Sequence, residues 1–394
     1  MLNEYNDLIE RTINRAKNPL PINESCLRDV LEKIIKYGYL NAIVDFISTS
    51  LQISDGCLLD VGCGSCWSAP FFLGRGAKCY HGVDVMTDLS TRTILDYRAF
   101  SAGRYKEMYQ ELPVSLNDLL SCFPDIQIIK KHIREVELGG ACYDHVVMLN
   151  VTEHLEQPRE DLAHVASLMN TDGHILINHH NYYCWTGHHD QPQALAEYDP
   201  EDIPMGELAD WNHVINLDFF DKKTSGLNLI RLHELLDILT TYFCIYRIEK
   251  IPPAPERGRN RMTPEIRKAL AKYYDDELFT EMLRCWGTKP ASKDLRPPHV
   301  QDVIPVNRIS RIQSYRGHCF QVAIPLGVVA TEFFLCEDDR PLGPGDSAGM
   351  EIIDNGRGRY LIWGRFLYFS TSDNSDPTAN GRQYTLQRVN GSRQ

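Results

Sequence analysis

Short apolar segments alternate with segments of helical periodicity along most of the chain, and this alternation limits the possible folds more than any other feature. The segment "YDHVVMLN" at 143–150 is apolar almost throughout, which is typical of a strand buried on both faces of a parallel sheet. Strands are expected at 57–62, 78–85, 125–133, 143–150, 174–183, 244–251 and 282–290. Because helices are expected between them, the sequence predicts an α/β fold with a doubly wound, mostly parallel seven-stranded sheet.

The chain has 394 residues, which is too long for one ordinary core and favours more than one domain. Residues 51–290 are expected to hold the sheet, with a long irregular insertion at 181–225. Residues 1–50 are expected to form helices that cover the ligand site. The stretch after 290 is rich in proline and charge, as linkers are, and 295–394 shows short strand patterns without a helix, which predicts an all-β domain.

The helices are expected where apolar residues recur at helical spacing. They are predicted at 4–17, 24–49, 67–73, 91–123, 160–169, 229–243 and 263–283. The last of them begins with Thr263 as N-cap and Pro264 at the first helical position.

Charge and composition exclude several classes of function. A net charge of -12 argues against nucleic acid as a general partner, because phosphate binding needs a positive surface. No apolar run is long enough for a membrane helix, and the first residues do not resemble a signal peptide. The twelve cysteines are therefore expected to be reduced, in a cytoplasmic protein. Cys63 and Cys66 form a lone CxxC pair, which does not by itself predict a zinc site.

The stretch "LLDVGCGSCW" at 58–67 joins the first strand to the first helix through Gly62 and Gly64. Ligands of open α/β sheets bind beyond the carboxyl ends of strands, and glycine lets the backbone approach them closely. Asp84 ends the next strand, where an acid can accept both hydroxyls of a ribose. The sequence therefore predicts a cofactor that contains a nucleoside.

Two residues favour a cationic cofactor over a dinucleotide. Trp67 stands where the dinucleotide fingerprint needs a third glycine, so the helix cannot approach the strand closely. Asp60 precedes the first glycine, where it would repel a pyrophosphate but attract a cation. S-adenosylmethionine, with its ammonium and sulfonium groups, fits this pattern better than NAD.

The motifs "LLDVGCGSCW", "GVDV", "YDHVVMLNVTEHLEQP" and "LMNTDGHILINHHN" together resemble the class I S-adenosylmethionine-dependent methyltransferases over about residues 35–290. The resemblance is strongest to the branch that includes the ubiquinone-biosynthesis O-methyltransferases. It implies a seven-stranded Rossmann-like domain with S-adenosylmethionine as cofactor.

The resemblance also assigns residues to the cofactor. It implies that Asp60, Gly62, Cys63 and Gly64 line the methionine end, that Asp84 with Val85 meets the ribose, and that Asn150 lies beneath the sulfonium. The family usually has an acid near the adenine after the third strand. His132 stands in that place here, and Glu135 or Glu137 could take the role instead.

A methyl transfer to an alcohol needs a base or a metal, because the hydroxyl pKa lies far above neutrality. Candidate bases are His154, His180, His189 and His213, with Asp190 placed to orient an imidazole. His154 has an alternative structural role in the family's "EH" signature. The histidine-rich segment has ligand types for a metal but no recognised spacing, so no metal site is predicted.

The β domain supplies the hint about the acceptor. Its stretches "PLGP", "GRYLIWG", "LYFSTSDNSDP" and "NGR" resemble C-terminal segments of bacterial surface-polysaccharide enzymes. The predicted activity is therefore O-methylation of a sugar hydroxyl in surface-glycan biosynthesis, with a small molecule or glycan as acceptor. Alternatives are an aromatic or natural-product O-methyltransferase, or an inactive methyltransferase-like scaffold. The acceptor, the methylated position, the role of the β domain and the oligomeric state stay open.

Overall fold

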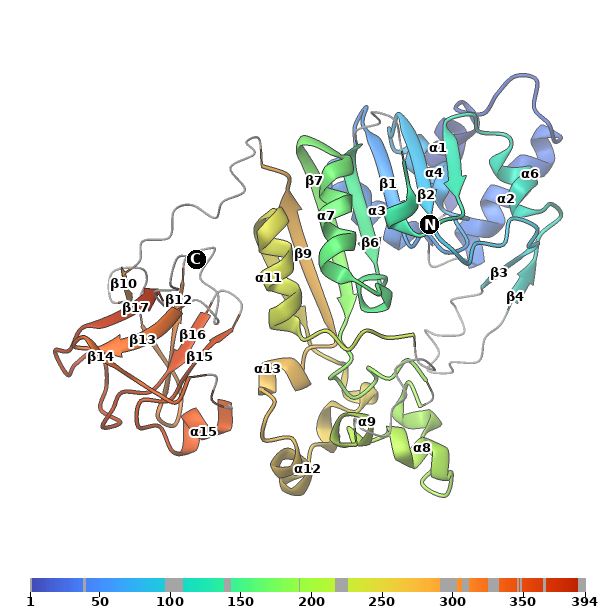
Figure 1. Cartoon of the computed structure of the whole chain (residues 1–394). Coiled ribbons are helices and arrows are strands. Elements are labelled where there is room, and N and C mark those ends of the chain that lie inside the picture. Colours follow the sequence, from blue (N-terminus) through green and yellow to red (C-terminus); the bar gives the residue numbers. More distant parts are fainter. Residues whose placement is uncertain are drawn as a thin grey trace.

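The structure is a computed structural model, and it describes residues 2–37, 40–95, 109–137, 143–190, 192–216, 226–290, 303–306, 312–324, 333–345, 347, 349–363 and 366–388. A seven-stranded sheet of order β5-β2-β1-β6-β7-β9-β8 forms its centre (Figure 1). The strands are β1 Cys57–Val61, β2 Cys79–Val83, β5 Ile126–Ile129, β6 Tyr143–Leu149, β7 Met169–His180, β8 Cys244–Ile251 and β9 Met282–Thr288. All seven lie at the predicted positions, which confirms the α/β fold.

Strand directions decide where a ligand site can form. The five strands β5, β2, β1, β6 and β7 pair in parallel, whereas β9 runs antiparallel to both β7 and β8. The carboxyl ends of β1, β2, β6 and β7 therefore meet along one edge of the sheet. Open α/β sheets bind their ligands at this edge.

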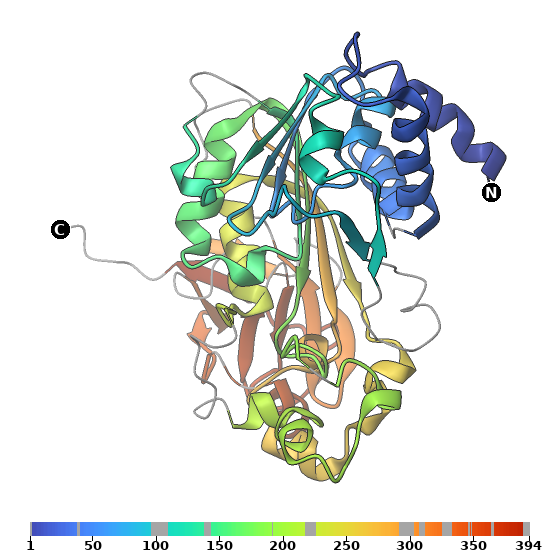
Figure 2. The ribbon, with the colours of Figure 1, turned by 90° about the vertical axis from the view of Figure 1, so that its right-hand side faces the viewer.

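Helices cover both faces of the sheet, as the apolar strands require. On β6, Val146 and Met148 contribute to one hydrophobic core and Val147 to the other, because successive side chains alternate between faces. One face carries α7 and α11 and the other α1 to α4 (Figure 2). The bounds of these helices are α1 Leu2–Ile13, α2 Glu24–Tyr37, α3 Leu40–Ser50, α4 Ala69–Gly74, α7 Pro158–Leu168 and α11 Leu232–Tyr242.

The helix expected over 91–123 is wrong in the described part of that range. Strands β3 Thr93–Leu95 and β4 Tyr109–Glu111 pair as an antiparallel ribbon, and only α6 Leu116–Leu120 is helical. Residues 96–108 lie outside the described part. The short helix begins where Ser115 and Asp118 form a capping box, a local signal that ends the preceding extended chain.

The described part of the insertion after β7 is mostly irregular and lies beyond the carboxyl ends of β6 and β7 (Figure 1). Within it the structure describes η3 Leu195–Glu197, α8 Ile203–Leu208 and α9 Asn212–Ile215. After β8 come η5 Pro255–Arg257, η6 Arg259–Arg261, α12 Pro264–Ala269 and α13 Asp275–Leu278. The side chain of Thr263 accepts the Ile266 N–H and caps α12, as expected, but the helix ends at Ala269 instead of continuing to 283.

The C-terminal region is all-β except for one short helix. It contains two antiparallel four-stranded sheets, of order β10-β17-β13-β14 and β11-β12-β16-β15. Its elements are β10 Val303–Pro305, β11 Gln313–Arg316, β12 Cys319–Ala323, β13 Phe333–Glu337, β14 Arg340–Pro341, α15 Gly349–Asp354, β15 Tyr360–Trp363, β16 Phe366–Phe369 and β17 Tyr384–Arg388. The expected linker at 291–302 lies outside the described residues.

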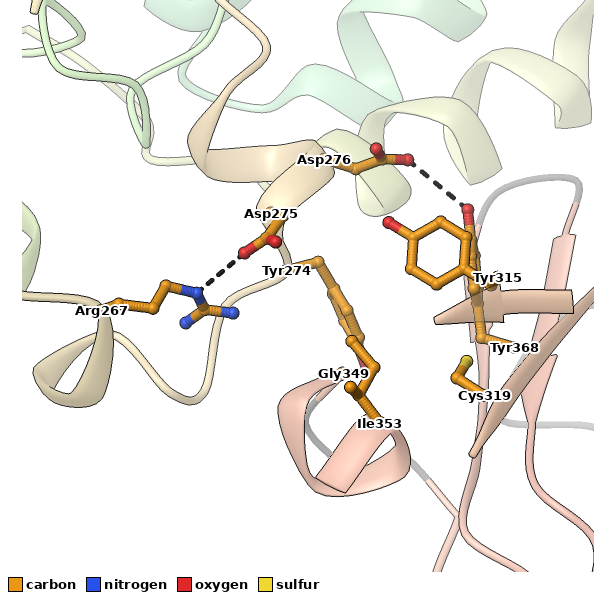
Figure 3. A pocket seen from close by; sticks show the side chains of 9 residues that line it. All are labelled: Arg267, Tyr274, Asp275, Asp276, Tyr315, Cys319, Gly349, Ile353 and Tyr368. Atoms are coloured by element: carbon orange, nitrogen blue, oxygen red, sulfur yellow. Dashed lines mark hydrogen bonds and ion pairs between the residues drawn. The ribbon is translucent and has the colours of Figure 1, made fainter. Parts of the chain in front are cut away.

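The β domain packs beside the sheet domain through aromatic side chains. Tyr274 donates from its hydroxyl to the carbonyl of Ser347 at 2.5 Å, and the Tyr368 hydroxyl lies 3.5 Å from Asp276 Oδ2 (Figure 3). Tyr368 and Cys319 belong to the same hydrophobic core as α7 and α11. The two domains therefore share part of one core.

The cysteines differ from expectation at one pair. Cys57 and Cys79 face each other across β1 and β2 and form a disulfide, so the prediction that all twelve cysteines are reduced is wrong there. At the glycine turn Cys66 donates its S–H to Cys63 Sγ at 3.0 Å, and this contact raises the pKa of Cys63, which keeps Cys63 as a thiol. No helix in the described residues is both long and apolar enough to span a bilayer.

Candidate active site

The turn after β1 adopts a backbone that only glycine fits. Gly62 has a φ of +71°, and its N–H donates to the carbonyl of Val83 at 2.8 Å. A Cβ at Gly62 would lie 2.6 Å from a methyl group of Val151, so a side chain is excluded by strain and by contact. Gly64 has a φ of +56° with open space where its Cβ would be. The side chain of Cys63 packs towards Gly82, so Cys63 presents its backbone to the turn.

Asp84 ties the second strand to this turn. The N–H of Gly64 donates to Asp84 Oδ2 at 2.9 Å, and the N–H of Met86 donates to Oδ1 at 2.6 Å. Val85 and Met86 follow with 57% and 83% of their surfaces exposed, which is unusual for large apolar residues. An acid beside two exposed apolar side chains can bind a ribose and an aromatic base.

Asp60 is half-buried at the carboxyl end of β1. The Tyr80 hydroxyl donates to Asp60 Oδ2 at 2.6 Å. Burial raises the pKa of Asp60 to about 7, the hydrogen bond from Tyr80 opposes this change, and the nearby charge of Asp84 adds to it. A cation placed beside Asp60 would stabilise the carboxylate.

Asn150 lies just beyond β6 with a φ of +53°, and a second asparagine holds it there. The Asn178 amide donates to Asn150 Oδ1 at 2.7 Å, and Arg284 donates from Nε to Asn178 Oδ1 at 2.9 Å. The Arg284 guanidinium in turn stacks 4.8 Å from the ring centre of Phe46. Asn150 was predicted as a site residue, whereas Asn178 and Arg284 were not. Asn178 lies on β7, 28 residues after Asn150, and Arg284 lies on β9, 106 residues after Asn178.

His132 follows β5, and its ring is engaged within its own loop. Nδ1 accepts the N–H of Arg134 at 3.3 Å and lies 3.7 Å from Asp161 Oδ1. The side chain therefore acts as the N-cap of the 3-10 helix η1 Ile133–Glu135. The apolar pair after Asp84 is better placed to meet a base than this imidazole.

Glu153, His154, His180 and His189 form a polar cluster beyond β6 and β7. Glu153 lies in the 3-10 helix η2 Thr152–His154 and is 2% exposed, with Oε2 3.5 Å from His179 Nδ1. His180 ends β7 and stacks on His189, with ring centres 4.3 Å apart. Burial lowers the pKa of His180 and brings that of His189 to about 4, so both imidazoles are neutral at pH 7.

His154 is the exposed member of the polar cluster, with its ring centre 5.3 Å from that of His189. Its Nδ1 lies 3.1 Å from the carbonyl oxygen of Gly226. Because a carbonyl only accepts, Nδ1 must carry the proton, which leaves the lone pair on Nε2. This placement suits a proton acceptor better than a packing residue.

Two other predicted residues are placed differently. His213 is fully buried, and both its ring nitrogens lie within 3.0 Å of the carbonyl oxygens of Leu208 and Tyr182. Asp190 donates its backbone N–H to His188 Nδ1 at 3.0 Å, while its side chain is exposed. His213 therefore packs the insertion, and the contact of Asp190 with an imidazole comes from its backbone.

The two tryptophans of the insertion pack inside it. Trp185 donates to Asp210 at 3.2 Å and Trp211 donates to the carbonyl of Tyr183 at 3.1 Å, and both rings are fully buried. These buried rings are therefore not available to stack on a substrate.

Comparison with known proteins decides the family. A family model described as a methyltransferase domain matches residues 32–241, more than half of the chain. The chain belongs to this methyltransferase-domain family. The prediction of an S-adenosylmethionine-dependent methyltransferase is confirmed at this level, whereas the ubiquinone-biosynthesis branch and the polysaccharide resemblance stay predictions.

Solved structures similar to the methyltransferase include three from bacteria, and curated proteins gave no match. The N-methyltransferase NodS from Bradyrhizobium japonicum WM9 is 12% identical, covers 63% of this chain and 93% of its own, and has a TM-score of 0.34. Geranyl diphosphate C-methyltransferase from Streptomyces coelicolor A3(2), in complex with Mg²⁺, geranyl diphosphate and S-adenosyl-L-homocysteine, is 12% identical. It covers 68% of this chain and 89% of its own, with a TM-score of 0.37. The YcgJ protein from Bacillus subtilis is 14% identical, covers 64% of this chain and 98% of its own, and has a TM-score of 0.35.

The methyltransferase thus brings most of its predicted site residues to one edge of the sheet. The glycine turn, Asp60, Asp84 and Asn150 surround the ends of β1, β2 and β6, and His154, His180 and His189 lie beyond β6 and β7. Glu153 was missed as a site residue, although the "VTEHLEQP" motif contained it. Its burial beside His179 could not be deduced from the motif.

Proposed function

We propose that this methyltransferase transfers the methyl group of S-adenosylmethionine to a hydroxyl group of a sugar-containing acceptor. The observation that carries the proposal is the polar cluster of Glu153, His154, His180 and His189, whose first two members follow Asn150 closely in the chain. Polar side chains suit an acceptor rich in hydroxyls, because they can replace its hydrogen bonds with water. With S-adenosylmethionine as donor and a nucleotide sugar as acceptor, the reaction belongs in the cytoplasm.

The cofactor would lie across the glycine turn. Asp60 would pair with its ammonium group, Asp84 would accept the ribose hydroxyls, and Val85 with Met86 would contact the adenine. Gly62 and Gly64 leave room for this approach, because neither carries a side chain over the turn. Asn150 would then face the sulfonium, between the cofactor and the polar cluster.

His154 is the proposed base. Its Nδ1 proton is directed to Gly226, so Nε2 can take the proton of the acceptor hydroxyl. The hydroxyl oxygen attacks the methyl carbon, and the carbon–sulfur bond breaks with its electron pair remaining on sulfur. The products are the methyl ether and S-adenosylhomocysteine. His189, with a pKa of about 4, is too weak a base to favour this role.

A cavity between the two domains favours an acceptor longer than one sugar. It has a volume of about 640 Å³ and lies between β8 and the sheet of the β domain. Tyr246, Tyr315 and Tyr368 line it together with Arg247 and Gln321. Aromatic rings stack on sugar faces while amide and guanidinium groups bond to hydroxyls, so a glycan chain could continue there.

The test begins with calorimetric titration of S-adenosylhomocysteine into the full-length protein, with NAD as control. We expect micromolar binding of S-adenosylhomocysteine alone. Nucleotide sugars and oligosaccharides are then incubated with S-adenosylmethionine and examined by mass spectrometry for an added methyl group. Methylation of aromatic hydroxyls alone would overturn the sugar assignment, and failure to bind S-adenosylhomocysteine would favour an inactive scaffold.

His154→Ala should lower turnover about 100-fold or more while leaving the affinity for S-adenosylhomocysteine unchanged. His174→Ala is the matched control, because His174 lies on the same strand as His180 but six residues earlier, opposite Thr288. Equal turnover of the two variants would remove His154 from the mechanism.

A further inference from the structure

Three side chains of the polar cluster come from separate segments of the chain and bring their polar atoms close together. Glu153 belongs to η2, His180 ends β7, and His189 lies in the insertion with a φ of +61°. One carboxylate oxygen and one ring nitrogen from each histidine all lie within 4.8 Å of one another. Among the described residues this is the group of histidine, cysteine, aspartate and glutamate side chains that could hold a metal ion.

Two atoms of this group lack the partners that buried polar atoms need. Glu153 Oε1 and His189 Nε2 are buried and have no hydrogen-bond partner within the described part of the protein. A buried carboxylate oxygen without a partner loses its hydrogen bonds to water and gains none, so such atoms are rare unless a ligand satisfies them. A cation between Glu153 and His189 would satisfy both.

Two neighbouring side chains hold the carboxylate of Glu153 in place. His179 and Thr152 contact Glu153 Oε2, at 3.5 and 3.4 Å, which fixes the orientation of the carboxylate.

We propose that Glu153, His180 and His189 bind one divalent ion of the zinc type and that this ion holds the acceptor hydroxyl. One carboxylate and two imidazoles form the donor set of many catalytic zinc sites, in which a further position stays open for water or substrate. The proposal rests on the proposed function, since it assigns the acceptor side of the same site. Sequence analysis predicted no metal because the ligands lie at 153, 180 and 189, a spacing that matches no motif.

The ion would assist the step already assigned to His154. An alcohol bound to a divalent cation loses its proton more readily, because the cation stabilises the alkoxide. The proton passes to His154 Nε2, the oxygen attacks the methyl carbon, and sulfur keeps the electrons of the broken bond. The ion is neither oxidised nor reduced.

Full-length protein without a histidine tag, stripped with EDTA and dialysed, is titrated with Co²⁺ while visible absorption is recorded. Calorimetry with Zn²⁺ gives the stoichiometry and affinity. We expect one ion per chain and new cobalt absorption bands. Glu153→Gln and His189→Ala should each weaken binding about 100-fold, whereas His174→Ala, six residues before His180 in the middle of β7, should bind as the wild type does.

Circular dichroism and binding of S-adenosylhomocysteine, measured in EDTA, show whether each variant is folded. If Glu153→Gln is unfolded, His189→Ala decides, because His189 is partly exposed in a loop. Wild-type protein that binds S-adenosylhomocysteine but no metal would overturn the metal site and leave the proposed function intact. Metal binding that survives in both variants would also overturn it, and absence of S-adenosylhomocysteine binding would count against the function itself.

Discussion

The protonation of Asp60 gives the cofactor site a testable pH dependence. Its carboxyl has a pKa of about 7 in the free protein, and the ammonium group of the cofactor needs the anion. Below pH 7 the proton must leave Asp60 before the cofactor binds, so affinity should fall as pH falls, by about tenfold per unit well below the pKa. Calorimetric titrations of S-adenosylhomocysteine between pH 5.5 and 8 would measure this slope.

The matched variant is Asp60→Asn. It should bind S-adenosylhomocysteine about 10–100-fold more weakly at pH 8, and its affinity should no longer change between pH 5.5 and 8. A slope that persists in Asp60→Asn would mean that another group controls binding.

Gly62 and Gly64 both have positive φ values, but only Gly62 faces an obstacle. Gly62→Ala adds a Cβ 2.6 Å from Val151, whereas Gly64→Ala meets nothing within 4 Å. Backbone strain alone costs about 1–2 kcal/mol at each position, and overpacking adds about 1–3 kcal/mol at Gly62. Urea denaturation should therefore show a clearly larger loss for Gly62→Ala, and equal losses would contradict this geometry.

At the scale of elements, β6, β7 and β9 end in a chain of hydrogen bonds that fixes Asn150. Asn178→Asp keeps the acceptor for Arg284 but loses the amide that donates to Asn150, whereas Asn178→Ala loses both. We expect both variants to stay folded and to bind S-adenosylhomocysteine about tenfold more weakly, because Asn150 loses the hydrogen bond that holds its side chain. Wild-type affinity in Asn178→Asp would show that Asn150 needs no support.

The strands could be predicted because their apolar runs are local, whereas several other elements depend on distant partners. The run at 143–150 is explained by burial on both faces, which periodicity reveals. The segment at 91–123 has helical periodicity, yet β3 forms because it pairs with β4 and because Trp67 donates to the carbonyl of Thr93. Tertiary contacts of this kind override local propensity.

The site shows the same division between local and distant information. Gly62, Gly64 and Asp84 could be predicted because a strand, a turn and the next strand fix their roles within about twenty residues. The separation of His213 from His180 and His189 could not be predicted. It arises because both ring nitrogens of His213 contact carbonyl oxygens within the folded insertion. Arg284 reaches Asn178 only through the pairing of β7 with β9.

At the scale of the whole molecule, the β domain and the cofactor site lie at opposite sides of the sheet. The β domain packs near β8 and α11, whereas the glycine turn follows β1 and lies towards β2 (Figure 1). Its contacts through Tyr274, Asp276 and Tyr368 hold α13 rather than the turn. Cofactor binding can therefore be tested in a chain from which the β domain has been removed.

A chain that ends after Pro290 should bind S-adenosylhomocysteine within about threefold of the full-length affinity. Its melting temperature should nevertheless fall, because removing Cys319, Ile352, Leu361 and Tyr368 exposes the core they share with α7 and α11. Calorimetry and thermal denaturation of the two proteins measure both effects. If the truncated chain is folded by circular dichroism but does not bind, the β domain must support the cofactor site through the sheet, and the acceptor site would then extend across both domains.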